Sequence, residues 1–104
     1  MDLNKFKSTL SSDTAPAGLS DALKAMWYDA KGNWGRAHDI AQEMPGAEGS
    51  WIHAYLHRKE GDHGNAAYWY HRANQPVCKL SLEEEWQQIV TALLRQIRPD
   101  AHAI

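Results

Sequence analysis

Cysteine is almost missing from this chain of 104 residues, which carries a single copy, Cys78. A disulfide within one chain therefore cannot form, and a metal site built from several cysteines is excluded. A lone cysteine fits a reducing compartment, and we expect a cytoplasmic protein. A chain of this length has room for one core and buries somewhat more than about 60% of its unfolded surface, so it can fold without disulfides.

Long apolar runs and runs of one charge are missing as well. No stretch approaches the roughly eighteen consecutive apolar residues of a membrane-spanning helix, and the first residues lack the apolar segment of a signal peptide. Eleven basic and thirteen acidic residues are interspersed along the chain and give a formal net charge of −2. Nucleic acids and anionic membranes need a concentrated cationic face, so we expect neither as a partner.

The sequence does contain a pattern of alanines and glycines that occurs twice, 29 positions apart. One copy runs from Ala25 to Ala37 and the other from Ala54 to Ala66. Each copy holds two glycines where a turn is expected, namely Gly32 and Gly35 in the first and Gly61 and Gly64 in the second. Such self-similarity is typical of stacked helical units, none of which buries its apolar face alone.

Apolar residues recur at helical spacing on both sides of each glycine turn, and no strand pattern competes. We therefore predict an all-α fold, a right-handed stack of two antiparallel helical hairpins closed by a long C-terminal amphipathic helix. The expected parts are an N-terminal segment with a short helix and a loop (1–18), hairpin one (19–46), hairpin two (48–75) and the C-terminal helix (81–98).

Local signals place several boundaries. Pro45 and Gly46 end hairpin one, and Gly49 or Ser50 begins the next helix. The final helix opens with a Ser-x-x-Glu capping box at Ser81. Every tryptophan falls on an apolar arc, and we expect all five in the core: Trp27, Trp34, Trp51, Trp69 and Trp86.

Residues 19–76 resemble known helical repeats. The tetratricopeptide pattern of small residue, turn glycine, alanine, aromatic and alanine is matched by Ala54, Gly61, Ala66, Tyr70 and Ala73. The run from Ala66 to Ala73 is similar to the second helix of Sel1-like repeats, and Trp51 to Ala73 is also similar to small bacterial proteins of uncharacterised function. The repeat families imply a non-enzymatic module in which the first helix of each pair lines a groove for a protein or peptide.

The residues expected to bind that partner are Lys24, Tyr28, His53, His57 and Tyr68. A shift of 29 positions places Lys24 beside His53 and Tyr28 beside His57, and a helical wheel turns both histidines away from the interface of their own hairpin. Tyr68 lies off the buried arc of its helix. Two hairpins are fewer than the roughly three repeats of a stable stack, so a homodimer would add buried surface.

The alternative function is a metal-binding or enzymatic site on the same helix face. His53 and His57 lie four residues apart, which lets two imidazoles share an ion, and Glu60 or His71 offer further ligands. A zinc-protease motif needs glutamate directly after the first histidine, where this chain has Ala54. A zinc site needs three or four ligands. The preferred interpretation therefore includes no metal and no cofactor.

The sequence gives little support for covalent catalysis by a nucleophilic side chain. Cys78 has no histidine close to it in the chain, and the serines lie at helix caps and in a loop. The turn glycines follow no strand, which a phosphate-binding loop would require. An enzyme is therefore the less favoured class.

Overall fold

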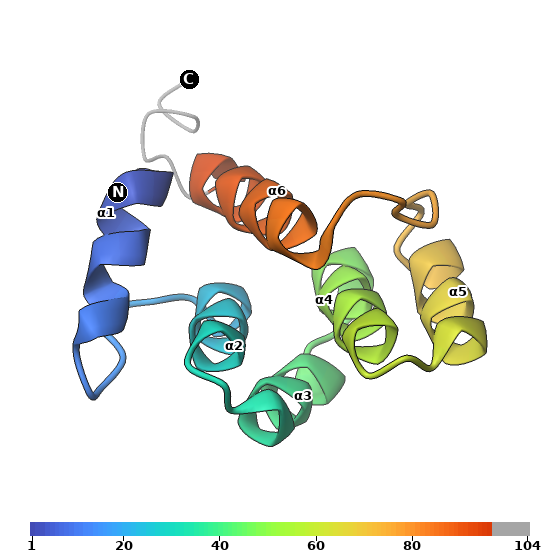
Figure 1. The fold of residues 1–104 in the computed structure, drawn as a ribbon, viewed down its shortest axis with the longest axis horizontal. Coiled ribbons are helices and arrows are strands. Elements are labelled where there is room, and N and C mark those ends of the chain that lie inside the picture. The colour runs from blue at the N-terminus through green and yellow to red at the C-terminus, as the bar shows by residue number, and fades with distance from the viewer. Residues whose placement is uncertain (97–104) are drawn as a thin grey trace.

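The computed structural model describes residues 1–96, which are helical with connecting loops (Figure 1). The elements of this part of the chain are a 3₁₀ turn (Thr9–Ser11) and α1 (Leu3–Ser8), α2 (Asp21–Ala30), α3 (Trp34–Glu43), α4 (Gly46–Lys59), α5 (His63–Arg72) and α6 (Leu82–Gln96). The prediction of an all-helical fold is confirmed. Residues 97 and 98, which the predicted final helix included, lie outside the described residues.

The two glycine turns make the same hydrogen bonds. The N–H of Gly32 donates to the carbonyl of Asp29 at 2.9 Å, and the N–H of Gly61 donates to the carbonyl of Arg58 at 3.0 Å. Both glycines adopt a positive φ, +85° and +89°, a left-handed conformation that a side chain would strain. Helix–glycine–helix turns were therefore predicted correctly at both sites.

The residue after each glycine caps the following helix. The Asn33 side chain accepts from the N–H of Arg36 at 3.1 Å, and the Asp62 side chain accepts from the N–H of Asn65 at 3.3 Å. These bonds satisfy donors that the first turn of a helix leaves free. The repeat of 29 residues thus corresponds to a repeated backbone structure at the turns.

Helix α4 begins at Gly46, so the predicted start at Gly49 or Ser50 is wrong. A Cβ atom on Gly49 would lie 2.7 Å from the Cβ and the carbonyl oxygen of Met44, and 3.2 Å from the carbonyl oxygen of Ala41. Gly49 therefore allows α4 to pass close to the end of α3, and its small size serves packing rather than capping.

Helix α4 lies in the middle of the fold and contacts α2, α3, α5 and α6 (Figure 1). Residues on every side of it are buried, and these are Gly49, Ser50 and all six residues from Ile52 to His57. A helix buried on all sides has no solvent face over that length. Helix α6 contacts α1, α2 and α4, whereas α5 packs on α4.

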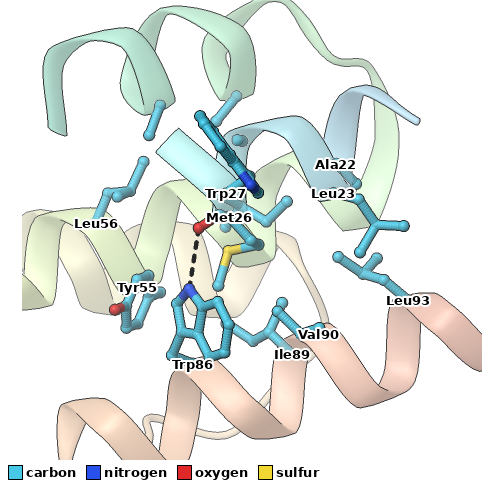
Figure 2. Close-up of a cluster of buried hydrophobic side chains, with 14 of the residues drawn as sticks. Ala22, Leu23, Met26, Trp27, Tyr55, Leu56, Trp86, Ile89, Val90 and Leu93 are labelled. Carbon is cyan, nitrogen blue, oxygen red and sulfur yellow. Dashed lines mark hydrogen bonds between the residues drawn. The ribbon is translucent and has the colours of Figure 1, made fainter. Parts of the chain in front are cut away.

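The main core forms where α2, α4 and α6 meet, with Phe6 of α1 added to it (Figure 2). The indole N–H of Trp86 donates to the carbonyl of Met26 at 3.0 Å and ties α6 to α2. Trp27 and Trp86 are buried as predicted, but the other three tryptophans are only partly buried. Those three are Trp34, Trp51 and Trp69, and they lie at the edges of the core clusters.

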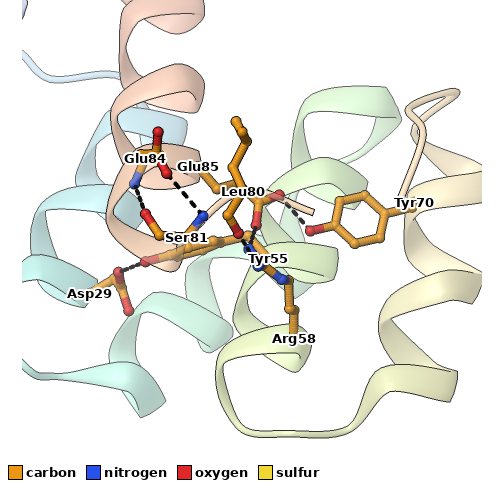
Figure 3. Close-up of polar contacts among 8 residues, drawn as sticks. All are labelled: Asp29, Tyr55, Arg58, Tyr70, Leu80, Ser81, Glu84 and Glu85. Carbon is orange, nitrogen blue, oxygen red and sulfur yellow. Dashed lines mark hydrogen bonds and ion pairs between the residues drawn. The ribbon is translucent and has the colours of Figure 1, made fainter. Parts of the chain in front are cut away.

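The predicted capping box opens α6 (Figure 3). The N–H of Ser81 donates to Glu84 Oε1 at 3.2 Å, and the N–H of Glu84 donates to Ser81 Oγ at 3.1 Å. Two donors of the first turn are thereby satisfied reciprocally.

The acidic side chain of Glu85 is completely buried and links three helices (Figure 3). Arg58 of α4 donates to Glu85 Oε1 at 2.7 Å, and the hydroxyl of Tyr70 of α5 donates to Oε2. Burial first, and then the neighbouring carboxylate, raises the pKa of Tyr70, so this hydroxyl stays protonated. The charge on Glu85 is therefore compensated on both oxygens.

A second buried carboxylate, that of Asp29, joins α2 to α4. The hydroxyl of Tyr55 donates to Asp29 Oδ2 at 2.8 Å, and the ammonium of Lys59 donates to Oδ1 at 2.9 Å. Burial and then Asp29 raise the pKa of Tyr55. The basic end of α4 therefore contains residues that pair with buried acids.

Candidate metal centre

Three histidines from two neighbouring helices bring their imidazole rings together. His38 comes from α3, and His53 and His57 come from α4. One ring nitrogen from each lies within 4.8 Å of those of the other two. The closest pair is His38 and His53, whose Nε2 atoms are 2.9 Å apart. The spacing of four residues puts His53 and His57 on one helix face, with ring centroids 4.7 Å apart.

Two tryptophans flank this cluster. Trp34 stacks on His38 with ring centroids 4.9 Å apart, and Trp69 of α5 stacks on His53 at 4.0 Å. The indole N–H of Trp34 donates to the carbonyl of Leu56 at 2.9 Å, which fixes its ring against α4. The histidines are thus held between aromatic rings from α3 and α5.

The carboxylate of Glu60 contacts the ring of His57. Nδ1 of His57 lies 2.7 Å from Glu60 Oε1, one helical turn further along. An ionised carboxylate only accepts, so Nδ1 of His57 is the donor of this hydrogen bond. Metal-binding histidines commonly donate their second ring nitrogen to a carboxylate in this way. Asp62 also lies close to this pair, in a second group of potential ligands.

The environment favours the neutral form of His53 and of His38. Burial first, and then the neighbouring His38 and His57, lowers the pKa of His53 to about 4. Burial, followed by His57, also lowers the pKa of His38. Between the two facing Nε2 atoms, one histidine donates its proton to the lone pair of the other. Neutral imidazole is the form that coordinates metal ions.

The predicted orientation of His53 is wrong. His53 and His57 are 6% and 7% exposed, and His53 does not point away from its own hairpin, because it packs on Trp69 of α5. The wheel argument assumed one buried arc, whereas α4 is enclosed by neighbours on all sides. Neither histidine can line an open groove. The pairing of His53 with His57 as potential ligands keeps its geometric basis.

The other predicted partner-binding residues remain accessible to different degrees. Lys24 and Tyr28 on α2 are partly buried, and the guanidinium carbon of Arg36 lies 5.4 Å from the Tyr28 ring centroid. Tyr68 on α5 is 52% exposed. Its hydroxyl accepts a hydrogen bond from Arg72 at 3.1 Å. Their role in partner binding stays a prediction.

Sequence reasoning missed His38. It lies four residues after Trp34, on the ridge that continues to Ala41, and this spacing is the signal that could have found it. Of the two additional ligands expected, Glu60 instead bonds to His57 from outside the cluster, and His71 is exposed on α5 and is not among the three converging residues.

No protein-family model matches this chain, and neither curated proteins nor solved structures match it significantly. Among the helices of the described residues, none has the length and apolar character needed to cross a membrane.

Proposed function

We propose that this protein binds one divalent transition-metal ion through His38, His53 and His57. The observation that carries the proposal is the convergence of three imidazole nitrogens, from two helices, to within 4.8 Å of one another. Imidazole nitrogen is a preferred ligand of zinc, copper and nickel ions, and three histidines with a fourth ligand complete a tetrahedral zinc site.

The distances are compatible with an ion after small side-chain movements. Tetrahedral zinc with Zn–N bonds of about 2.0–2.1 Å separates its ligand nitrogens by about 3.4 Å. The pair His38 and His53 stands at 2.9 Å and the widest pair at no more than 4.8 Å, so each ring moves by about 1 Å or less. The ion would take the place of the proton shared between the two Nε2 atoms.

Metal content of protein purified without a histidine tag tests the proposal. We expect about one zinc ion per chain, or stoichiometric zinc binding by calorimetry after chelation. His38→Ala should abolish stoichiometric binding while helicity is kept, because His38 is the least buried of the three. His71→Ala, at an exposed position on α5, is the matched control and should bind like wild type. Equal binding by both variants would refute the site.

Glu60 offers a second test that separates coordination from packing. Loss of such an outer hydrogen-bond acceptor typically weakens metal binding about 10–100-fold. Glu60→Ala should show this loss. Glu60→Gln keeps an acceptor for the Nδ1 proton and should recover much of the affinity. If both variants bind zinc like wild type, Glu60 has no part in orienting His57.

A second candidate function is a protein- or peptide-binding module, as the resemblance to tetratricopeptide and Sel1-like repeats implies. In this proposal the hairpins α2–α3 and α4–α5 stack in a right-handed manner and α6 closes the stack. The observation that favours it is the exposed Tyr68 beside Arg72 on α5, a helix that packs on α4. Tyrosine and arginine are enriched in binding hot spots. The single free cysteine fits a cytoplasmic location.

The occupant tested for this surface is a second copy of the chain. Sedimentation velocity should show a dimer whose dissociation constant rises at least tenfold in Tyr68→Ala. Glu43→Ala, at an exposed position at the end of α3, is the comparison and should dimerise like wild type. A wild-type chain that is monomeric at every concentration would exclude self-association through α5.

A further inference from the structure

Among the described residues, the ligand set of the proposed metal centre lacks one member, and this inference rests on that centre. Within residues 1–96, the converging group consists of His38, His53 and His57. Structural zinc sites take all four ligands from the protein, whereas sites with three protein ligands keep a position for water or substrate. The donors present therefore match an open site rather than a closed one.

Charge favours a small anion at that position. Imidazoles coordinate metal ions in their neutral form, so three of them leave the full double charge of the ion uncompensated. The carboxylate of Glu60 lies one ring away from the ion, because it is bonded to Nδ1 of His57 at 2.7 Å. A cationic centre of this kind attracts hydroxide and other small anions and acidifies bound water.

The surroundings limit the size of that ligand. Trp34 lies against His38, and Trp69 lies against His53, so indole rings occupy two sides of the imidazole cluster. His38 itself is only partly buried, so solvent reaches part of this residue. A ligand of a few atoms fits these surroundings better than a side chain or a peptide.

We propose that the metal ion bound here carries an exchangeable water molecule in its fourth position and that a small monovalent anion replaces it. A zinc ion held by His38, His53 and His57 would lower the pKa of such a water molecule and would supply a hydroxide nucleophile.

The cobalt(II)-loaded protein provides the test, because the visible absorption bands of cobalt(II) change when one of its ligands changes. Azide and thiocyanate are the probes. We expect each to shift the bands saturably with a stoichiometry of one anion per metal. Metal content after dialysis should remain one per chain at saturation. His71→Ala should give the same titration as wild type, since it lies outside the cluster.

The outcomes separate this inference from the proposed function. Stoichiometric cobalt binding with bands that neither anion changes would mean that the chain supplies the fourth ligand, which overturns the open position and leaves the metal centre standing. Loss of metal on adding anion would also overturn it. Failure to bind either zinc or cobalt would instead remove the metal centre itself.

Discussion

At the scale of single residues, His53 is the most buried of the three histidines of the proposed metal centre. Its ring lies between the indole of Trp69 and the imidazoles of His38 and His57, and burial holds its pKa at about 4. A protonated His53 would lose its hydration because it is buried. It would also be repelled by a proton on the facing nitrogen of His38. At neutral pH His53 is therefore a neutral donor.

The depressed pKa predicts acid sensitivity of the metal-free protein. Unfolded His53 has a pKa near 6.5, so between about pH 6.5 and 4 the unfolded state binds more protons than the folded state, and stability falls as pH decreases. From pH 7.5 to pH 5, His53 alone should remove about 2 kcal/mol from the free energy of unfolding. Urea unfolding in the presence of a chelator measures this loss.

His53→Gln is the matched variant, because glutamine does not titrate. Its loss of stability between pH 7.5 and pH 5 should be smaller than that of wild type by about the same 2 kcal/mol. Parallel pH profiles for the two proteins would show that His53 is not neutral in the folded state.

At the scale of the elements, the sequence predicts turns better than it predicts the surroundings of a helix. The glycine turns at 32 and 61 and the capping box of α6 depend on nearby residues, and they were predicted correctly. The burial of α4 on all sides depends on four other helices. A helical wheel of one segment cannot contain that information, which is why the burial of His53 and His57 was not predicted and His38 was overlooked.

Two glycines of hairpin two should respond oppositely to alanine. Gly61 has a φ of +89°, so Gly61→Ala forces a side chain into left-handed backbone and should destabilise the protein by about 1–2 kcal/mol. Gly64 lies in the first turn of α5, and a Cβ there meets no atom within 4 Å. Gly64→Ala should be neutral or stabilising by up to about 1 kcal/mol. Thermal unfolding of the two variants checks the contrast, and equal effects would contradict the assigned turn.

The pair between Arg58 and Glu85 makes the junction of α4 and α6 sensitive to the loss of one partner. Arg58→Met leaves the completely buried Glu85 with only the Tyr70 hydroxyl, and we expect a loss of about 3–5 kcal/mol. The double variant with Glu85→Gln removes the unpaired charge and should recover part of that loss. Chemical denaturation measures both, and a double variant less stable than Arg58→Met would contradict the account.

At the scale of the whole molecule, the proposed ion would connect the two hairpins. His38 belongs to α3 of hairpin one, whereas His53 and His57 belong to α4 of hairpin two. An ion that binds only the folded protein stabilises it by about 2.7 kcal/mol at a free concentration one hundred times its dissociation constant. For a domain of this size that corresponds to a rise in Tm of about 10 °C or more.

Thermal unfolding with and without zinc measures this rise. His38→Ala should abolish it, because the variant removes the only ligand contributed by hairpin one among the three converging histidines. An equal rise in Tm for wild type and His38→Ala would show that zinc acts elsewhere on the molecule.

X-ray absorption at the zinc edge tests the central claim most directly. For zinc-loaded wild-type protein we predict three imidazole nitrogens and one oxygen at about 2.0–2.1 Å from the ion. His38→Ala should lose one imidazole or the ion itself. A spectrum with fewer than three imidazoles in the wild-type protein, or a chain that retains no zinc, would contradict a metal centre at His38, His53 and His57.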